Sequence, residues 1–366
     1  MNMPRTNPRN DRIKRDYLIY LKDARQRSPA TVEQVRHAID RLEVYTGFQD
    51  FGTFNKEQAR GFKRALVASK GQRSGKPIST STAHHILQAL KEFLAWLHSR
   101  PTHRRRIDPT HIAYLNLTTN DERAAHASRP KSYATLQQYR AALFAMPTGN
   151  EVDRRDQALM ALLLLTGMRD AAVIGLKLKH ISIERGHVFQ DPREIQTKFR
   201  KAIETFFYPV GEDIGDIVRA WVQYLVTERL YGPNDPLFPK TEVRPGEHKT
   251  FTAQGLTREH WANAAPVRQI FRKAFARVEL PYVKPHSIRD TLTQLAYKLQ
   301  LNLEAMKAWS QNMGHDSMMT TLCSYGPVSP ERQAEIIGAL GQSDATARNK
   351  DIATEIAIQV VARMKG

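Results

Sequence analysis

Apolar residues recur at helical spacing along most of this chain, and that periodicity restricts the folds open to it. In residues 30–45 the apolar positions fall on one face, directly after Ser28-Pro29, a pair typical of a helix start. Similar stripes predict further helices over residues 11–22, 56–69 and 79–99. An all-helical domain over residues 1–115 follows, with its basic residues on the outer faces.

The helical pattern is interrupted between residues 180 and 210. Residues 181–183 and 187–189 have strand character and flank the turn signal Arg185-Gly186, and residues 202–210 are rich in β-branched and aromatic side chains. Helical spacing then predicts helices over residues 213–230, 265–278, 287–300, 303–312 and 318–324. The predicted fold class is therefore mainly α with a small β-sheet (α+β). A length of 366 residues suits two domains, the second over residues 133–335.

Two segments fall outside these domains. Residues 116–132 are polar and lack apolar periodicity, so they are predicted to be a linker. Residues 336–366 form a tail whose apolar positions recur every four residues, at Ile352, Ile356, Val360 and Met364. Two interpretations of this stripe stay open: packing on its own domain and docking onto a neighbouring subunit.

The charge of the chain is strongly positive and unevenly distributed. The net charge is +18, and residues 1–132 carry 25 Lys and Arg against 12 Asp and Glu, a net +13. An excess of this size indicates a polyanionic partner, with nucleic acid favoured over an anionic membrane. Arg104, Arg105 and Arg106 form a basic run that fits either a phosphate contact or a solvated helix end.

Cellular location and cysteine chemistry are constrained by what the sequence lacks. No stretch approaches the apolar length of a membrane span, and the N-terminus has no apolar segment of the signal-peptide type. The single cysteine, Cys323, excludes an intramolecular disulfide and a cysteine-cluster metal site. We therefore expect a cytoplasmic protein.

Several basic residues stand where they could bind an anion. Arg169 follows a helix and a Thr-Gly turn, where a fixed guanidinium can grip a planar oxyanion through two hydrogen bonds. His286 and Arg289 are three residues apart at a predicted helix start, near a positive helix end. His315 follows a glycine between two predicted helices. Each of these residues is a weak signal alone.

Two further residues complete an ordered set. Lys198 lies where the tip of a β-hairpin is expected, and Arg200 and Lys201 compete with it for the same role. Tyr325 ends a short predicted helix, ten residues after His315. Read together, the order is an arginine, a hairpin lysine, a His-x-x-Arg box, a Gly-His pair and a tyrosine.

This ordered set resembles the tyrosine recombinases and phage integrases. The resemblance covers residues 133–335, and the N-terminal helices look like the core-binding domain of that family. It identifies the catalytic residues as Arg169, Lys198, His286, Arg289, His315 and Tyr325.

The resemblance implies a site-specific recombinase that cleaves and rejoins duplex DNA through a 3′-phosphotyrosine. Arg169 and Arg289 are expected to hold the scissile phosphate, with a hydrogen bond from His315. His286 is expected to act as the base for Tyr325. Lys198 is then expected to protonate the leaving oxygen, and neither a cofactor nor a metal ion is implied.

The same resemblance implies the partners. They are double-stranded DNA and, on DNA, three further copies of the chain in a homotetramer, with a monomer or weak oligomer expected when free. Accessory DNA-bending proteins are a further expected class of partner, and a nucleoid location follows. Arg104, Arg105, Arg106, Arg200 and Lys201 are candidate DNA-binding residues.

The chain also departs from the family pattern. The acidic residue common three positions after the first arginine is Ala172 here, and Asp170 is one candidate to replace it. The hairpin lacks glycines around Lys198, and the spacing from His315 to Tyr325 is one residue longer than in many members. Two alternatives are a type IB topoisomerase and a non-catalytic DNA-binding regulator on the same fold.

Overall fold

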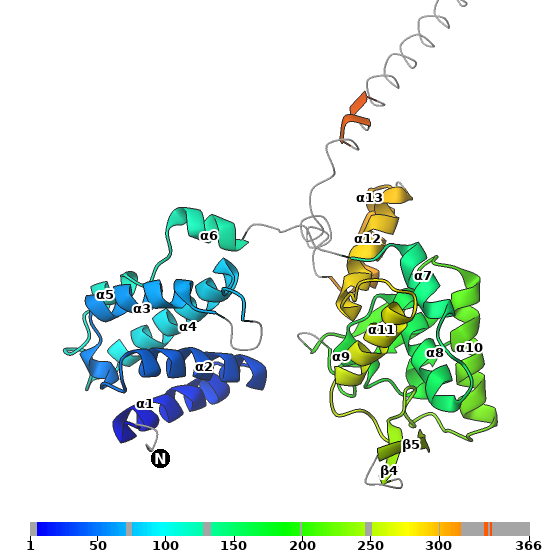
Figure 1. The fold of residues 1–366 in the computed structure, drawn as a ribbon, viewed down its shortest axis with the longest axis horizontal. Coiled ribbons are helices and arrows are strands. Elements are labelled where there is room, and N and C mark those ends of the chain that lie inside the picture. Colours follow the sequence, from blue (N-terminus) through cyan, green and yellow to red (C-terminus); the bar gives the residue numbers. More distant parts are fainter. Residues whose placement is uncertain are drawn as a thin grey trace, which may run out of the picture. The chain divides into compact units, whose positions relative to one another are not determined.

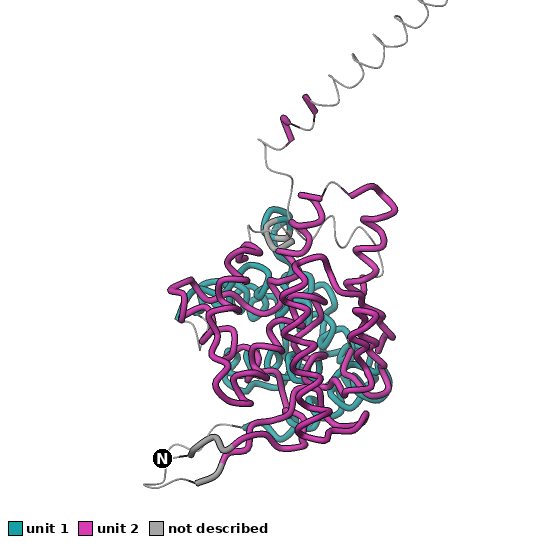
Figure 2. The backbone as a smooth tube through the Cα atoms, turned by 90° about the vertical axis from the view of Figure 1, so that its right-hand side faces the viewer, with its two compact units in different colours: residues 1–128 teal, residues 129–366 magenta. Residues whose placement is uncertain are grey.

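A computed structural model describes residues 6–70, 75–126, 133–197, 200–245, 251–299, 301–315, 333–335 and 337–338. The chain divides into two compact units, residues 1–128 and 129–366, which Figure 2 distinguishes by colour. Three predicted features lie outside the described residues: Lys198, the helix over 318–324 with Tyr325, and the apolar stripe over 352–364.

The elements named in the described residues of unit 1 are all helical, as predicted (Figure 1), and an isolated β-bridge joins Lys70 to Pro77. Its elements are α1 (Pro8–Ile19), the π-helical turn η1 (Tyr20–Ala24), α2 (Pro29–Tyr45), the 3₁₀ turn η2 (Phe51–Thr53), α3 (Lys56–Ala68), α4 (Thr80–His98), α5 (Pro109–Ala113) and α6 (Thr119–His126). Helix α1 begins earlier than predicted because the Asn7 side chain accepts hydrogen bonds from the first backbone N–H groups.

Side-chain caps explain why the other helices of unit 1 begin where they do. Ser28 and Ser79 accept backbone N–H groups in the first turns of α2 and α4, and Asn55 forms a capping box with Gln58 at α3. Helix α4 contacts α2, α3, α5 and α6, and its Phe93 is fully buried. The predicted linker is therefore not irregular throughout, because α6 occupies part of it and packs on α4.

Unit 2 combines helices with short strands. Its helices are α7 (Leu136–Phe144), α8 (Glu151–Thr166), α9 (Asp170–Val173), α10 (Glu212–Thr227), α11 (Ala265–Arg277), α12 (Ile288–Lys298) and α13 (Leu303–Asn312). Its 3₁₀ turns are η3 (Leu178–His180) and η6 (Pro285–Ser287). Its strands are β1 (Ile181–Ser182), β2 (His187–Gln190), β3 (Ile203–Phe206), β4 (Thr241–Pro245) and β5 (Phe251–Leu256). The α+β prediction is confirmed.

The strands form two antiparallel sheets. The first has the order β1-β2-β3, with Val188 opposite both Ile181 and Thr205. Strand β3 ends before the predicted residue 210 because the Tyr208 N–H donates to the Leu165 carbonyl of α8 instead of continuing the ladder. The second sheet, β4–β5, was not predicted, and Figure 1 shows it projecting from the end of unit 2 opposite α13.

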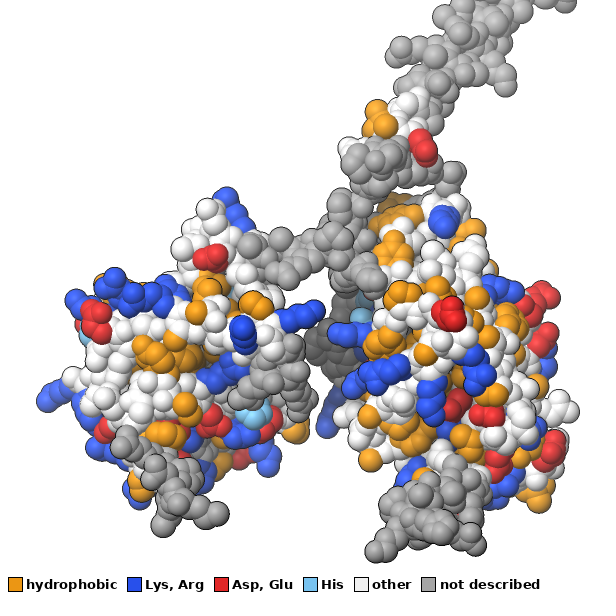
Figure 3. Space-filling view, in the orientation of Figure 1, with side chains coloured by type: hydrophobic (Ala, Val, Ile, Leu, Met, Phe, Trp, Pro, Cys, Tyr) orange, Lys and Arg blue, Asp and Glu red, His pale blue; other side chains and the backbone are white. Residues whose placement is uncertain are grey.

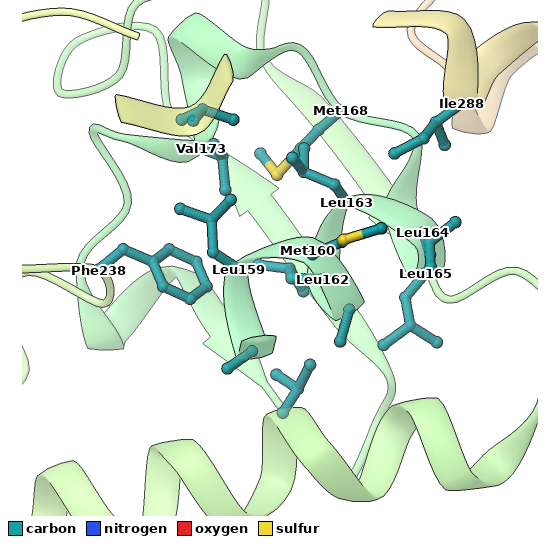
Figure 4. Close-up of a cluster of buried hydrophobic side chains, with 14 of the residues drawn as sticks. Leu159, Met160, Leu162, Leu163, Leu164, Leu165, Met168, Val173, Phe238 and Ile288 are labelled. Carbon is teal, nitrogen blue, oxygen red and sulfur yellow. The ribbon is translucent and has the colours of Figure 1, made fainter. Parts of the chain in front are cut away.

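Helix α8 is the central element of unit 2. It contacts α7, α9, α10 and α11, and every residue from Ala158 to Thr166 is buried. Figure 4 shows its leucines packed with Met168, Val173, Phe238 and Ile288. A helix buried on all sides fixes the position of the residues that follow it. None of the helices described in either unit has both the length and the apolar character that a bilayer span requires.

Candidate active site

The turn that carries Arg169 is fixed by a glycine. Helix α8 ends at Gly167, whose φ of +58° lies in the left-handed region, and Arg169 then caps α9 with extended backbone. A Cβ on Gly167 would lie 2.8 Å from Leu292 Cδ1, so both the conformation and the space require glycine. The helix and turn predicted before Arg169 are therefore confirmed, and the Arg169 side chain is half-buried there.

The His-x-x-Arg box lies where the 3₁₀ turn η6 leads into α12. The side chain of His286 is exposed, whereas that of Arg289 is only 2% exposed. Ser287 fixes the turn, because its hydroxyl donates to the Lys284 carbonyl at 2.7 Å and lies 2.8 Å from the Tyr139 hydroxyl. The box thus presents one accessible imidazole and one enclosed guanidinium.

Arg289 joins the three motif segments of unit 2. Its Nη1 donates to the Gly167 carbonyl at 2.8 Å, in the turn before Arg169. Its Nη2 donates to the Met313 carbonyl at 2.8 Å and lies 2.6 Å from His315 Nε2. Charge-assisted bonds to carbonyls held by two different helix ends fix the guanidinium plane. The structure therefore brings Arg289 and His315 together and ties both to the Arg169 turn.

The contact between Arg289 and His315 determines the tautomer of the histidine. A guanidinium has only donors, so His315 Nε2 must accept the hydrogen bond. In this arrangement the imidazole is neutral and its proton lies on Nδ1. Any hydrogen bond that His315 donates to a phosphate in this state must come from Nδ1.

The turn before His315 is attached to strand β3. Gly314 has a φ of +70°, and a Cβ there would lie 2.8 Å from Ile203 Cδ1. The Asn312 side chain accepts from the Phe206 N–H at 2.7 Å and donates to the Phe206 carbonyl at 2.8 Å. The strand edge and the end of α13 are thus bound side by side, which places His315 relative to the hairpin.

Lys198 and Tyr325 lie outside the described residues. The competitors of Lys198 are described: Arg200 is exposed with a φ of +52°, and Lys201 is half-buried. Strands β2 and β3 pair antiparallel on either side of residues 191–202, so the predicted hairpin connection around Lys198 is present.

The acidic replacement for Ala172 was left open by the sequence. Ala172 is 2% exposed and faces the core of unit 2. Asp170 accepts a hydrogen bond from Arg268, and Arg268 Nη2 lies 3.3 Å from Asp170 Oδ2. The Asp170 carboxylate therefore forms an ion pair with Arg268.

The basic run of unit 1 divides into two kinds of residue. Arg106 Nη2 lies 3.0 Å from Asp50 Oδ2, and its guanidinium covers Gly52. Arg104 and Arg105 have exposed side chains. Lys and Arg side chains are spread over the displayed face of unit 1 in Figure 3. Arg106 thus has a structural contact that its two neighbours are not seen to make.

Sequence reasoning missed the residues that hold the motifs in place. Thr291 Oγ1 donates to the Ala134 carbonyl at 2.6 Å, and the hydroxyl groups of Tyr139 and Ser287 are hydrogen-bonded. These contacts attach the His-x-x-Arg box to α7 and to the residues just before it. Burial raises the pKa of the Tyr139 phenol well above its ordinary value, which keeps it a neutral hydrogen-bonding partner. No local sequence signal marks these contacts, because the partners of Ser287 and Thr291 lie about 150 residues away in the chain.

In the part of the chain that the structure describes, no three His, Cys, Asp or Glu side chains are grouped so as to hold a metal ion. The site built from described residues consists of arginine and histidine side chains at three helix ends. Such a set is suited to binding and polarising an oxyanion.

Comparisons with known proteins agree with this geometry. Residues 133–332, more than half of the chain, match the Phage integrase family. No curated protein sequence matched the chain.

Solved structures with the same fold include three DNA complexes. One is the Tn1549 transposon integrase with transposon right end DNA, at 15% identity and a TM-score of 0.58, covering 90% of this chain and 99% of that one. Another is a lambda integrase tetramer bound to a Holliday junction, at 15% identity and a TM-score of 0.57, covering 88% and 83%. The third is XerH bound to its difH substrate, at 14% and 0.54, covering 88% and 83%.

With the family match over residues 133–332 and the motif residues of that region gathered around Arg289, the chain belongs to the phage integrase family and is a tyrosine site-specific recombinase.

Proposed function

We propose that this recombinase cleaves each DNA strand by attack of Tyr325 on a phosphodiester, forming a 3′-phosphotyrosine, and then rejoins the strand to a new 5′-hydroxyl. The observation that carries the proposal is the position of Arg289, enclosed between the Arg169 turn and His315. The bond energy retained in the phosphotyrosine drives rejoining without ATP.

Arg169 and Arg289 neutralise the phosphate in this proposal. Negative charge grows on the non-bridging oxygens as the phosphorus becomes pentacoordinate, and preorganised cations stabilise that charge most effectively where water is excluded. Arg289 satisfies this condition because it is 2% exposed and its plane is fixed by two carbonyls. His315 contributes a hydrogen bond to a phosphate oxygen through Nδ1.

His286 and Lys198 carry out the two proton transfers in this proposal. A phenol has a pKa of about 10, so Tyr325 requires a base or nearby cations to react at neutral pH. His286 has the accessible imidazole of the site and accepts that proton. The Lys198 ammonium gives a proton to the 5′-oxygen as the bond from phosphorus to that oxygen breaks.

The partner is duplex DNA, and four copies of the chain assemble on two sites to exchange strands. Support comes from the fold shared with integrases solved on DNA, one of them as a tetramer on a Holliday junction. Unit 1 adds phosphate contacts through its exposed basic residues, among them Arg104 and Arg105. Because genomic DNA is the substrate, we place the protein in the cytoplasm at the nucleoid.

The tail supplies the contact between subunits in this proposal. Its stripe from Ile352 to Met364 is apolar on one face, and such a face needs a partner surface. We propose that it docks onto an adjacent subunit in the tetramer. Deleting residues 345–366 is expected to abolish tetramers on DNA while leaving cleavage by single subunits, and unchanged synapsis would contradict the docking.

A suicide-substrate assay tests the function. Nicked duplexes from the DNA that flanks the gene trap the covalent intermediate, because the released strand is too short to return. The wild-type chain is expected to form an adduct that survives denaturation, and Tyr325→Phe is expected to form none. An adduct of equal yield in the Phe variant would refute the proposal, and supercoil relaxation without strand exchange would favour a topoisomerase.

A further inference from the structure

We propose that Glu194 is a positioning residue for the general acid Lys198. The inference rests on the proposed role of Lys198 and extends it to a carboxylate that no sequence motif singled out. The geometry that points to it is an ion-pair anchor at the start of the β2–β3 connection, formed by Glu194 with Lys177 and Lys179.

Glu194 is held from both sides by lysines. Lys177 Nζ donates to Oε2 and Lys179 Nζ donates to Oε1, each at 2.7 Å. The buried His180 adds a third nitrogen, with its Nε2 3.7 Å from Oε2. These two lysine hydrogen bonds hold the pKa of the Glu194 carboxyl down at about 2, so the carboxylate is charged throughout the physiological range.

The lysines that hold Glu194 project from a fixed part of unit 2. The Leu178 N–H donates to the Asp235 carbonyl at 3.1 Å, and the Lys179 N–H donates to the Pro233 carbonyl at 2.9 Å. His180 Nδ1 accepts from the Lys177 N–H at 3.0 Å. The anchor therefore joins the connection to the η3 segment, which is itself hydrogen-bonded to the turn that follows α10.

The connection carries this restraint toward Lys198. The Ile195 N–H donates to the Asp191 carbonyl at 2.8 Å, and the Ile195 side chain is buried. The Thr197 N–H then donates to the Ile195 carbonyl at 2.9 Å, and the Arg200 N–H to the Thr197 carbonyl at 3.2 Å. The described residues on both sides of Lys198 are thus linked to one another and, through Glu194, to the body.

A general acid is sensitive to such restraint. Misplacing a catalytic group by about 1 Å can reduce a rate by about 100-fold, and the lysine must meet the 5′-oxygen while the bond to phosphorus breaks. Removing the charge of Glu194 weakens two charge-assisted hydrogen bonds and allows the connection to move. The resulting defect is confined to protonation of the leaving group.

Bridging-sulfur substrates separate this role from a general structural one. When sulfur replaces the 5′-bridging oxygen, the leaving group is a thiolate, which is far less basic than an alkoxide because thiols such as that of cysteine have a pKa of about 8.5. It therefore departs without a general acid. Single-turnover cleavage is measured at saturating protein on matched oxygen and sulfur suicide duplexes. We expect Glu194→Gln to be about tenfold slower or more on oxygen and equal to wild type on sulfur.

Three variants make the outcome decisive. Glu184→Gln makes the same change at an exposed position of the turn between β1 and β2 and is expected to match wild type on both substrates. Lys198→Ala should show the larger oxygen-selective loss, and the paired change Lys177→Gln with Lys179→Gln should reproduce Glu194→Gln. If Lys198→Ala shows no oxygen-selective loss, its proposed role as the acid falls. If Lys198→Ala shows the oxygen-selective loss but Glu194→Gln cleaves like wild type, the positioning role alone is overturned. The same conclusion follows if Glu194→Gln is equally slow on both substrates.

Discussion

The turn between α8 and α9 gives the most direct test of how the site is built. Replacing Gly167 with Ala places a side chain in the left-handed region, at a cost of about 1–2 kcal/mol. The new methyl group would lie 2.8 Å from Leu292 Cδ1, a side chain that is 1% exposed, and overpacking of that kind costs about 1–3 kcal/mol. The expected loss of unfolding free energy is about 2–5 kcal/mol.

Calorimetry on the full-length chain measures this loss. For a unit of this size, 1 kcal/mol corresponds to about 2–4 °C, so the melting temperature of unit 2 should fall by about 4–20 °C. Cleavage should fall as well, because the Gly167 carbonyl accepts from Arg289 and the turn leads into Arg169. Adding Leu292→Ala removes the obstructing methyl group, so the double variant should lose at least about 1 kcal/mol less than the sum of the singles.

Gly215→Ala is the matched control. Gly215 lies within α10 with nothing within 4 Å of an added Cβ, so alanine there should stabilise the helix by about 0.5–1 kcal/mol. Gly167→Ala melting within about 1 °C of wild type would show that the turn tolerates a side chain, and the account of the Arg169 junction would then be wrong.

Three further predictions concern the turn at Gly314, the loss of stability at acid pH and the N-terminal cap of α3. Gly314→Ala, with φ of +70° and Ile203 Cδ1 2.8 Å from the added Cβ, should reduce cleavage more than DNA binding, measured by single-turnover rate and by titration; equal loss of both would contradict this. The pKa of Glu194 is about 2 in the folded chain against an ordinary 4.5, so its stabilisation is present above about pH 4.5 and is lost as the pH falls toward 2. Urea titrations should therefore show a smaller acid loss in Glu194→Gln than in wild type, and identical curves would refute the lysine anchor. Asn55→Ala removes the capping box of α3 and should cost unit 1 about 1 kcal/mol, with the melting of unit 2 unchanged in the same calorimetric scan.

Local signals allowed much of the fold to be predicted. The helices of unit 1 begin at Ser28, Asn55 and Ser79 because a capping side chain next to an apolar stripe is a property of neighbouring residues. The β4–β5 hairpin was missed because its strands are polar, with glycine and proline close by, so no alternation marks them. Strand β5 also contacts α8, and residues of a single segment do not encode that contact.

The contacts within the site could not be predicted from local sequence either. Motif order and spacing were enough to select Arg289 and His315, but not the atoms that Arg289 contacts. Its bond to the Gly167 carbonyl spans 122 residues, and the acceptor is backbone, which no residue type reveals. The proposed role of Glu194 could not be predicted from the sequence for a related reason, because it depends on Lys177 and Lys179, which lie in an earlier segment.

In the proposed reaction, Tyr325 becomes joined to DNA in a site organised by Arg289. The most direct measurement is mass spectrometry of the protease-digested adduct from the suicide substrate. We expect a peptide with Tyr325 carrying a 3′-nucleotide through its phenolic oxygen, and no such peptide from an Arg289→Ala chain that still binds DNA. A nucleotide attached to any other residue, or an undiminished yield of adduct from Arg289→Ala, would contradict it.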